Sequence, residues 1–139
     1  MSRALKTSGF LGLTTMMGVG MYQHSLAAAG QPVPSWLVGG HAHLGVLSIL
    51  AVVMGFAVDA FGLTGTLRNA VSGLYIVGQW LLPVSVWVGV GFGVTILLPA
   101  VFLWGLCLIA AMLIMAWQAA TTTTQSFGGG ARGVSPADD

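Results

Sequence analysis

The chain has 139 residues, of which 56% are hydrophobic and 5% are charged, and its formal net charge is +1. About 25% of the residues in an average soluble domain are charged, so this composition excludes a soluble fold, and its hydrophobicity excludes disorder of the whole chain. The low net charge gives no basic surface for nucleic acid, and the single cysteine, Cys107, excludes an internal disulfide.

Four apolar stretches follow one another along the chain, and each is at least as long as the roughly 20 residues that cross a bilayer. The predicted spans are residues 9–29, 36–61, 70–93 and 95–120. Pro32 and Pro34 separate the first two spans, and a polar turn at 62–69 separates the second from the third. The sequence therefore predicts an all-α, integral membrane four-helix bundle over residues 1–120, followed by a disordered tail, 121–139, that is rich in Thr, Gly and Ser.

The break between the third and fourth spans is marked weakly, by glycines, Thr95 and Pro99. Residues 71–120 are long enough for two crossings and too long for one, so we expect a tight hairpin there. Pro83 lies near the middle of the third span, and we expect it to kink that helix.

The few basic residues predict the orientation in the membrane. Arg3 and Lys6 precede the first span, Arg68 lies between the second and third, and Arg132 follows the fourth. The other two connections carry no Lys or Arg, so the positive-inside rule places both termini in the cytoplasm. The chain is thus expected to be a multi-pass protein of the cell membrane.

A cleaved signal peptide is the alternative for the first span. Arg3 and Lys6 give a basic start, residues 9–20 form an apolar core, and three alanines at 27–29 resemble a cleavage site. A polar stretch, 21–24, separates the apolar core from the alanines, so we expect the span to be retained. Cleavage would remove His24 from any site.

All three histidines fall in one layer of the predicted bundle. His24, His41 and His43 each lie about five to seven residues from the outer end of a span, which is roughly 7 to 11 Å below the boundary. Imidazole is costly inside a membrane and is a common ligand of haem iron and copper. The layer therefore predicts a haem or metal site with these three candidate ligands. For each histidine the alternative is a hydrogen bond to a carbonyl or to water near the interface.

His41 and His43 are expected to act separately, because residues two apart on a helix point about 200° from each other. Bulky apolar residues follow His43, and such a face suits haem. The residues on this face are Leu47, Leu50 and Met54. Small or polar residues follow His41, and such a face lets another helix approach closely. The residues on that face are Gly45, Ser48, Val52, Gly55 and Asp59.

Two further polar residues lie within the predicted spans. Asp59 is the one acid there, and we expect it to form an ion pair with Arg68 across the turn. Gln79 is expected to hydrogen-bond another helix, through Ser48 or Ser85.

The segment 40–48, Gly-His-Ala-His-Leu-Gly-Val-Leu-Ser, resembles the second helix of subunit I of the haem–copper oxidase and nitric oxide reductase superfamily. It is closer still to small four-helix membrane proteins described as cytochrome c oxidase subunit I-like. The segment 79–84, Gln-Trp-Leu-Leu-Pro-Val, is similar to the third helix of those small proteins. Styrene oxide isomerase, which has four spans and a b-type haem, has a related layout.

The resemblance implies that His43 ligates a b-type haem and that the haem lies between subunits of an oligomer; the role of His41 stays open. The chain also departs from these families. Ile49 stands where the isomerase has an asparagine, and Trp87 or Val88 stands near its substrate-handling tyrosine. The copper-site histidines of full-length oxidases sit on later helices that a four-span chain lacks, so oxygen reduction by this chain alone is not expected.

The sequence therefore predicts a small integral membrane protein that binds haem b for redox, gas-related or Lewis-acid chemistry, alone as a homo-oligomer or with a membrane partner. One alternative is a non-catalytic structural or assembly subunit of a larger membrane complex. Another is a copper-binding protein that uses His24, His41 and His43. No general acid or base stands out, so no enzymatic reaction is predicted from the residues alone.

Overall fold

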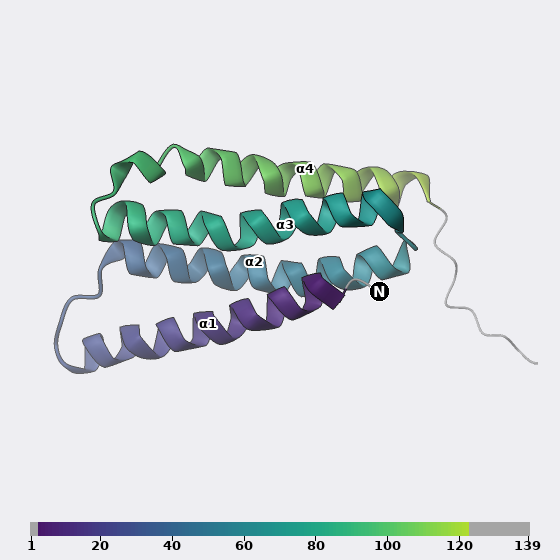
Figure 1. Cartoon of the computed structure of the whole chain (residues 1–139). Helices are drawn as coiled ribbons and strands as arrows, with labels where there is room; N and C mark the ends of the chain where they lie inside the picture. Colours follow the sequence, from purple (N-terminus) through teal and green to yellow (C-terminus); the bar gives the residue numbers. More distant parts are fainter. Residues whose placement is uncertain (1–2, 123–139) are drawn as a thin grey trace, which may run out of the picture.

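The computed structural model describes residues 3–122, which form four long α-helices joined by short connections (Figure 1). The helices are α1 (Arg3–Ala28), α2 (Ser35–Ala60), α3 (Gly65–Val86) and α4 (Ala100–Thr121). The predicted all-α fold with four helices is confirmed. The predicted tail lies outside the described residues from residue 123 onward.

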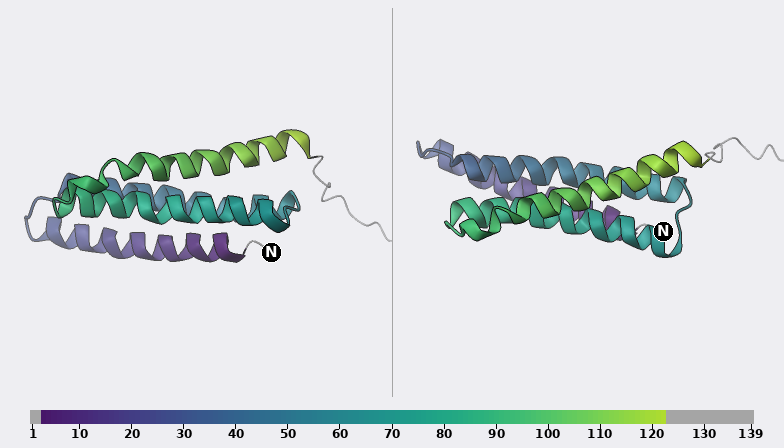
Figure 2. Two further views of the ribbon diagram at one scale, coloured as in Figure 1. Left: turned by 45° about the horizontal axis from the view of Figure 1, so that its top comes forward. Right: turned by 90° about the horizontal axis from the view of Figure 1, so that it is seen from above.

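Successive helices run antiparallel and lie in chain order, so that α1 packs on α2, α2 on α3, and α3 on α4 (Figures 1 and 2). The described chain, which starts with α1, therefore begins at the end of the bundle where α4 finishes. We call this the charged end, because Arg3, Lys6, Asp59 and Arg68 lie there. The opposite end, where α1 joins α2, is called the histidine end.

Three helical segments of the described chain are long and apolar enough to cross a membrane: Ser35–Ala60, Gly65–Gly91 and Thr95–Thr121. The first helix, α1, has 26 residues but is interrupted by hydroxyl and amide side chains, so it does not belong to this group. The composition of the helices thus supports three of the four predicted spans.

The connection between α3 and α4 is more elaborate than a tight hairpin. The α3 helix passes through Pro83 and ends in a π-helical turn, Trp87–Gly91. Gly93 then adopts a φ of 71°, a left-handed conformation that favours glycine, and a short 3-10 helix, Thr95–Leu97, precedes α4. A widened, π-helical turn thus begins four residues after Pro83, and the predicted kink at Pro83 itself stays a prediction.

The core lies between α2, α3 and α4 and also includes Leu5 of α1, which is fully buried. Tyr75 is fully buried at its centre, and its hydroxyl donates a hydrogen bond to the carbonyl of Leu47 at 3.0 Å. Met54 and Met115 pack against this centre from the two flanking helices. The core thus joins three helices around one tyrosine whose polar atom has a partner.

The first helix lies close against α2 because glycines of each helix lie against larger residues of the other. A methyl group at Gly9 would lie 2.6 Å from Cγ2 of Val52, and a side chain at Gly45 would overlap the sulfur of Met16. Gly12 meets Ser48 in the same way. The prediction that the His41 stripe of α2 forms a close helix contact is confirmed.

Asp59 forms its ion pair with Lys6 of α1, at 2.8 Å, and the predicted pairing with Arg68 is wrong. Gly55 makes this possible, because a methyl group there would lie 2.7 Å from Cγ of Lys6. The Lys6 ammonium also lies 4.1 Å from the centroid of the Phe56 ring. The packing of α1 on α2 therefore brings Lys6 to Asp59, although Arg68 is nearer to Asp59 in the sequence.

A double-mutant cycle with Lys6→Met and Asp59→Asn tests this pair. Both side chains are partly exposed, so we expect a coupling energy of about 0.2–1 kcal/mol. Thermal unfolding of the purified protein in detergent measures it. The matched cycle with Arg68→Met and Asp59→Asn should give a smaller coupling, and the reverse order would contradict the assignment.

Candidate functional site

The three histidines all lie at the histidine end. A methyl group at Gly20 of α1 would lie 3.0 Å from Cε1 of His41, and Gln23 donates a hydrogen bond to the carbonyl of Leu37 at 3.0 Å. These contacts fix the register of α1 against α2. His24 lies one turn beyond Gly20 and is exposed.

His41 and His43 point in different directions, as the helix geometry predicted. His41 faces α1, and its Nδ1 is buried without a hydrogen-bond partner among the residues that the structure describes. His43 is exposed on the outer surface of α2. The two rings therefore belong to different environments and do not form a pair.

The ring of His43 has a defined orientation. Its Nδ1 lies 2.7 Å from the carbonyl oxygen of Gly39, one turn earlier in the same helix. A carbonyl oxygen can only accept a hydrogen bond, so in the neutral ring the proton is on Nδ1. The lone pair is then on Nε2, which is the arrangement found when a histidine ligates a metal and its other nitrogen is held by a carbonyl.

The surroundings of His43 are apolar. A pocket of about 310 Å³ lies over it, lined by Ala42, His43, Val46 and Leu47. All four belong to α2, so the pocket has one wall from this chain and is open on its other side. The residues predicted to form one bulky face with His43 line two different pockets. Leu47 lines the pocket of His43, whereas Leu50 and Met54 line a separate pocket between α2 and α4.

Within residues 3–122, no group of three or more His, Cys, Asp or Glu side chains is arranged to hold a metal ion. The three predicted ligands are thus placed at one end of the bundle but are not gathered into one cluster. This finding gives no support to a copper site that uses all three histidines. It does not bear on haem ligation by one histidine, which needs a single protein nitrogen.

A buried network of hydrogen bonds joins α1, α2 and α3 near the middle of the bundle. Gln79 is 0% exposed, and its Nε2 donates to Ser48 Oγ and to the Ser8 carbonyl, both at 3.1 Å. Ser8 Oγ donates to Gln79 Oε1 at 2.9 Å and accepts the indole N–H of Trp80 at 2.9 Å. The amide of Gln79 is therefore satisfied on both sides, which indicates a structural role.

The network confirms the predicted contact of Gln79 with Ser48. The other candidate, Ser85, instead accepts the indole N–H of Trp104 at 3.0 Å. Sequence reasoning missed Ser8, which lies one residue before the predicted first span, although a serine directly before that span was a signal that could have identified it.

Two tryptophans fix the π-helical turn against the start of α2. Trp36 packs its ring over Gly91, and Trp87 packs its indole against Gly40. Trp87 Nε1 is buried without a partner in the described part of the chain. This reciprocal contact holds the backbone next to Gly39, the residue that orients His43.

The whole chain, residues 1–139, matches a family described as "Domain of unknown function (DUF8059)", and the chain belongs to this family. No curated protein and no solved structure matches it.

Proposed function

We propose that the protein is a multi-pass membrane protein in which all four helices cross the bilayer, with the charged end in the cytoplasm. Three apolar helices support this. All the basic residues of the described chain, Arg3, Lys6 and Arg68, lie at one end, as the positive-inside rule requires.

The first helix is included because its polar groups are compatible with a membrane. Ser8 points into the buried network. Thr14 and Thr15 donate to the carbonyls of Phe10 and Leu11 in their own helix, each at 3.0 Å. These hydrogen bonds lower the cost of exposing a hydroxyl to lipid.

The proposed function is the binding of a b-type haem through His43. The observation that carries it is the orientation of the ring, whose Nδ1 is held by Gly39 and which lines an apolar pocket on the outer face of α2. A bound haem would supply redox, gas-binding or Lewis-acid chemistry at its iron.

The residues of this chain would hold and tune the group. The Gly39 carbonyl keeps the imidazole in one tautomer and makes Nε2 a better ligand. Val46 and Leu47 exclude water from the ligand side. Because all lining residues belong to one helix, a second copy of the chain or a membrane-complex partner is expected to close the pocket.

Absorption spectra of the detergent-purified protein, oxidised and dithionite-reduced, test the proposal. We expect a Soret band in the wild type and its loss in His43→Ala, because no other residue in this pocket can ligate iron. His24→Ala is the matched control and should keep the band, since His24 is exposed on a different helix. A wild type without a Soret band after growth with added haem, or a band retained in His43→Ala, would overturn the proposal.

A second candidate function is that of a non-catalytic subunit of a larger membrane complex. The outer face of α1 favours it, because Thr14 and Gly18 are exposed there and nothing lies within 4 Å of a methyl group built at Gly18. Small residues let another helix approach closely. This function predicts no chromophore, and histidine substitutions that change assembly only.

A further inference from the structure

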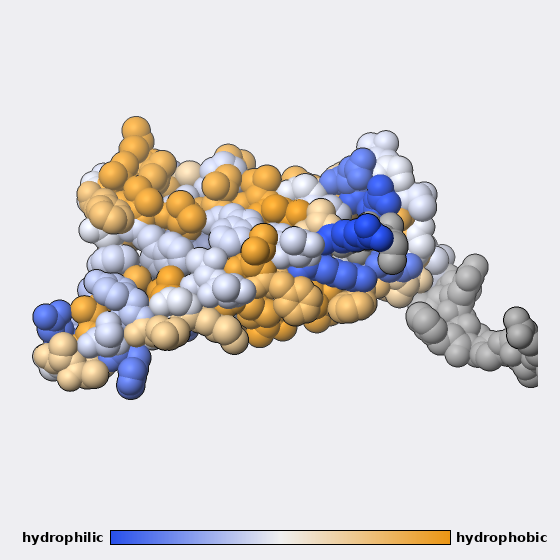
Figure 3. All heavy atoms as spheres, turned by 60° about the horizontal axis from the view of Figure 1, so that its bottom comes forward, coloured by the Kyte–Doolittle hydropathy of each residue, from blue (hydrophilic) through white to orange (hydrophobic). Residues whose placement is uncertain are grey.

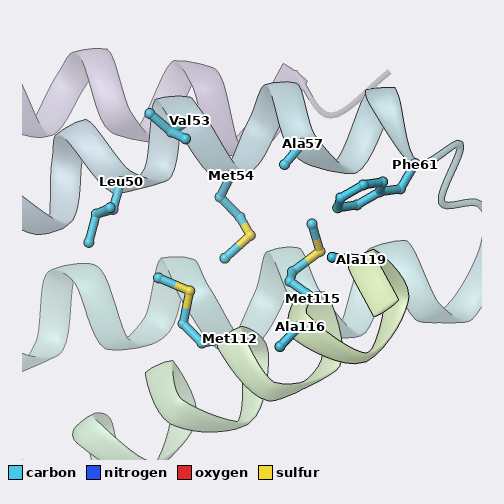
Figure 4. A pocket seen from close by; sticks show the side chains of 9 residues that line it. All are labelled: Leu50, Val53, Met54, Ala57, Phe61, Met112, Met115, Ala116 and Ala119. Carbon is cyan, nitrogen blue, oxygen red and sulfur yellow. The ribbon is translucent and has the colours of Figure 1, made fainter. Parts of the chain in front are cut away.

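A groove lies between α2 and α4 and is lined by residues of α2, of its C-terminal end and of α4 (Figure 4). Its volume is about 470 Å³. Met54, Met112 and Met115 point into it. The short side chains of the alanines at 57, 116 and 119 leave space along its sides. None of the lining side chains carries nitrogen or oxygen, so the groove offers a ligand only hydrocarbon and thioether surfaces.

The groove has the length of one membrane leaflet. Along α2 it runs from Leu50, near the middle of the helix, to Phe61, just after its last turn. Eleven residues at about 1.5 Å each give roughly 16 Å, close to half of the hydrocarbon thickness of about 30 Å. In the membrane orientation proposed above, the groove therefore extends from the bilayer centre to the boundary at the charged end.

The shape and chemistry of the groove decide between possible occupants. A helix of a second copy is about 10 Å wide, so a volume of 470 Å³ would admit only about one turn of it. A ligand with buried polar groups would find no partner for them. A flexible hydrocarbon chain meets neither difficulty, and methionine side chains adapt well to such a shape.

Charge indicates the kind of headgroup. The end of the bundle that the groove reaches carries Arg3, Lys6 and Arg68, against Asp59 as the one acid of the described chain. The described residues at this end thus have a net charge of 3 − 1 = +2. Arg68 is the fourth residue of α3, shortly after Phe61. On the face seen in Figure 3, hydrophilic residues gather at this end and also at the histidine end, with apolar residues between them.

We infer that the groove between α2 and α4 binds one hydrocarbon chain of an anionic membrane lipid, whose headgroup lies at the charged end. The inference rests on the membrane orientation proposed above and is independent of haem. It assigns the three methionines of the groove a role in contacting the lipid chain, in addition to packing within the bundle.

Native mass spectrometry of the full chain in detergent tests the inference. The probes are phosphatidylglycerol and phosphatidylcholine with identical acyl chains. We expect one phosphatidylglycerol to be retained per chain, in preference to phosphatidylcholine. Ala116→Phe places a ring in the groove and should lower retention roughly tenfold, as expected when about two methylene groups lose their contacts. Ala120→Phe, one turn further along α4 and outside the groove, is the matched control and should retain the lipid.

Two further variants keep the test decisive. Ala57→Phe fills the groove from α2 and replaces Ala116→Phe if that protein does not fold. Arg68→Gln should lower the preference for phosphatidylglycerol roughly fivefold, the attraction of about one cation near a membrane surface, without removing chain binding.

The outcomes separate this inference from the proposed function. Equal retention by wild type, Ala116→Phe and Ala57→Phe would overturn the groove as the site. Equal retention of the two lipids by the wild type would overturn the anionic headgroup, and a dimer that forms only when the groove is open would identify a second copy as the occupant. Protein absent from the membrane fraction would refute the membrane orientation, whereas loss of the Soret band in His43→Ala with lipid retained would leave this inference intact.

Discussion

A Gly12→Val variant is expected to lose about 2–4 kcal/mol of unfolding free energy, because overpacking and a broken buried hydrogen bond both contribute. Gly12 faces the buried network across the contact of α1 with α2. A β-carbon there would overlap Ser48 Oγ and lie 2.7 Å from Gln79 Nε2. The backbone of α1 would have to move away, which separates Ser8 from Gln79.

Thermal unfolding in detergent, followed by circular dichroism, measures this loss. The matched control is Gly18→Val on the same helix, where a β-carbon has nothing within 4 Å. Both variants carry the same cost of a β-branched residue in a helix, so their difference isolates the tertiary contact. Equal stability of the two variants would contradict the position of α1 in the bundle.

A Gln79→Ala variant is expected to lose about 3 kcal/mol, the combined cost of a cavity and of unpaired buried hydroxyls. Gln79 makes three hydrogen bonds to Ser8 and Ser48, and no solvent reaches it. After substitution Ser8 Oγ and Ser48 Oγ each lose a partner in an apolar interior. The loss should fall mainly on the attachment of α1 to α2 and α3.

Gln118→Ala provides the comparison for Gln79→Ala. Gln118 is half-buried near the end of α4 and accepts one hydrogen bond, from Thr122 at 3.2 Å. Its substitution should cost less than about 1 kcal/mol, the net worth of a single hydrogen bond near the helix end. Limited proteolysis of both variants reports whether α1 detaches. A Gln79→Ala protein as stable as Gln118→Ala would show that the network contributes little.

The same network favours retention of α1 over its removal as a signal peptide. Cleavage after residue 29 would take away Ser8, which is the partner of Gln79 Oε1 and of the Trp80 indole. It would also remove Lys6 from Asp59. A fully buried glutamine without that partner would be costly, so we expect removal of α1 to destabilise the packing of the remaining helices.

The sequence by itself determined the four helices and the division of α2 into faces. Both depend on local rules, the length of apolar stretches and the period of the α-helix. For the same reason it correctly separated His41 from His43 and identified the close-packing stripe that starts at His41. It also brought the three histidines to one end, since antiparallel helices joined by short connections allow no other arrangement.

The tertiary structure decided most of the side-chain pairs between helices, although the sequence also predicted the contact of Gln79 with Ser48. The register of α1 on α2 places Lys6 beside Asp59, where they form an ion pair. The contact of α1 with α3 places Ser8 within hydrogen-bond distance of Gln79. Such pairings depend on shifts of a few ångströms between helices, which side-chain packing sets and sequence spacing does not encode. The groove between α2 and α4 has the same origin, because it exists only where α3 holds two helices apart.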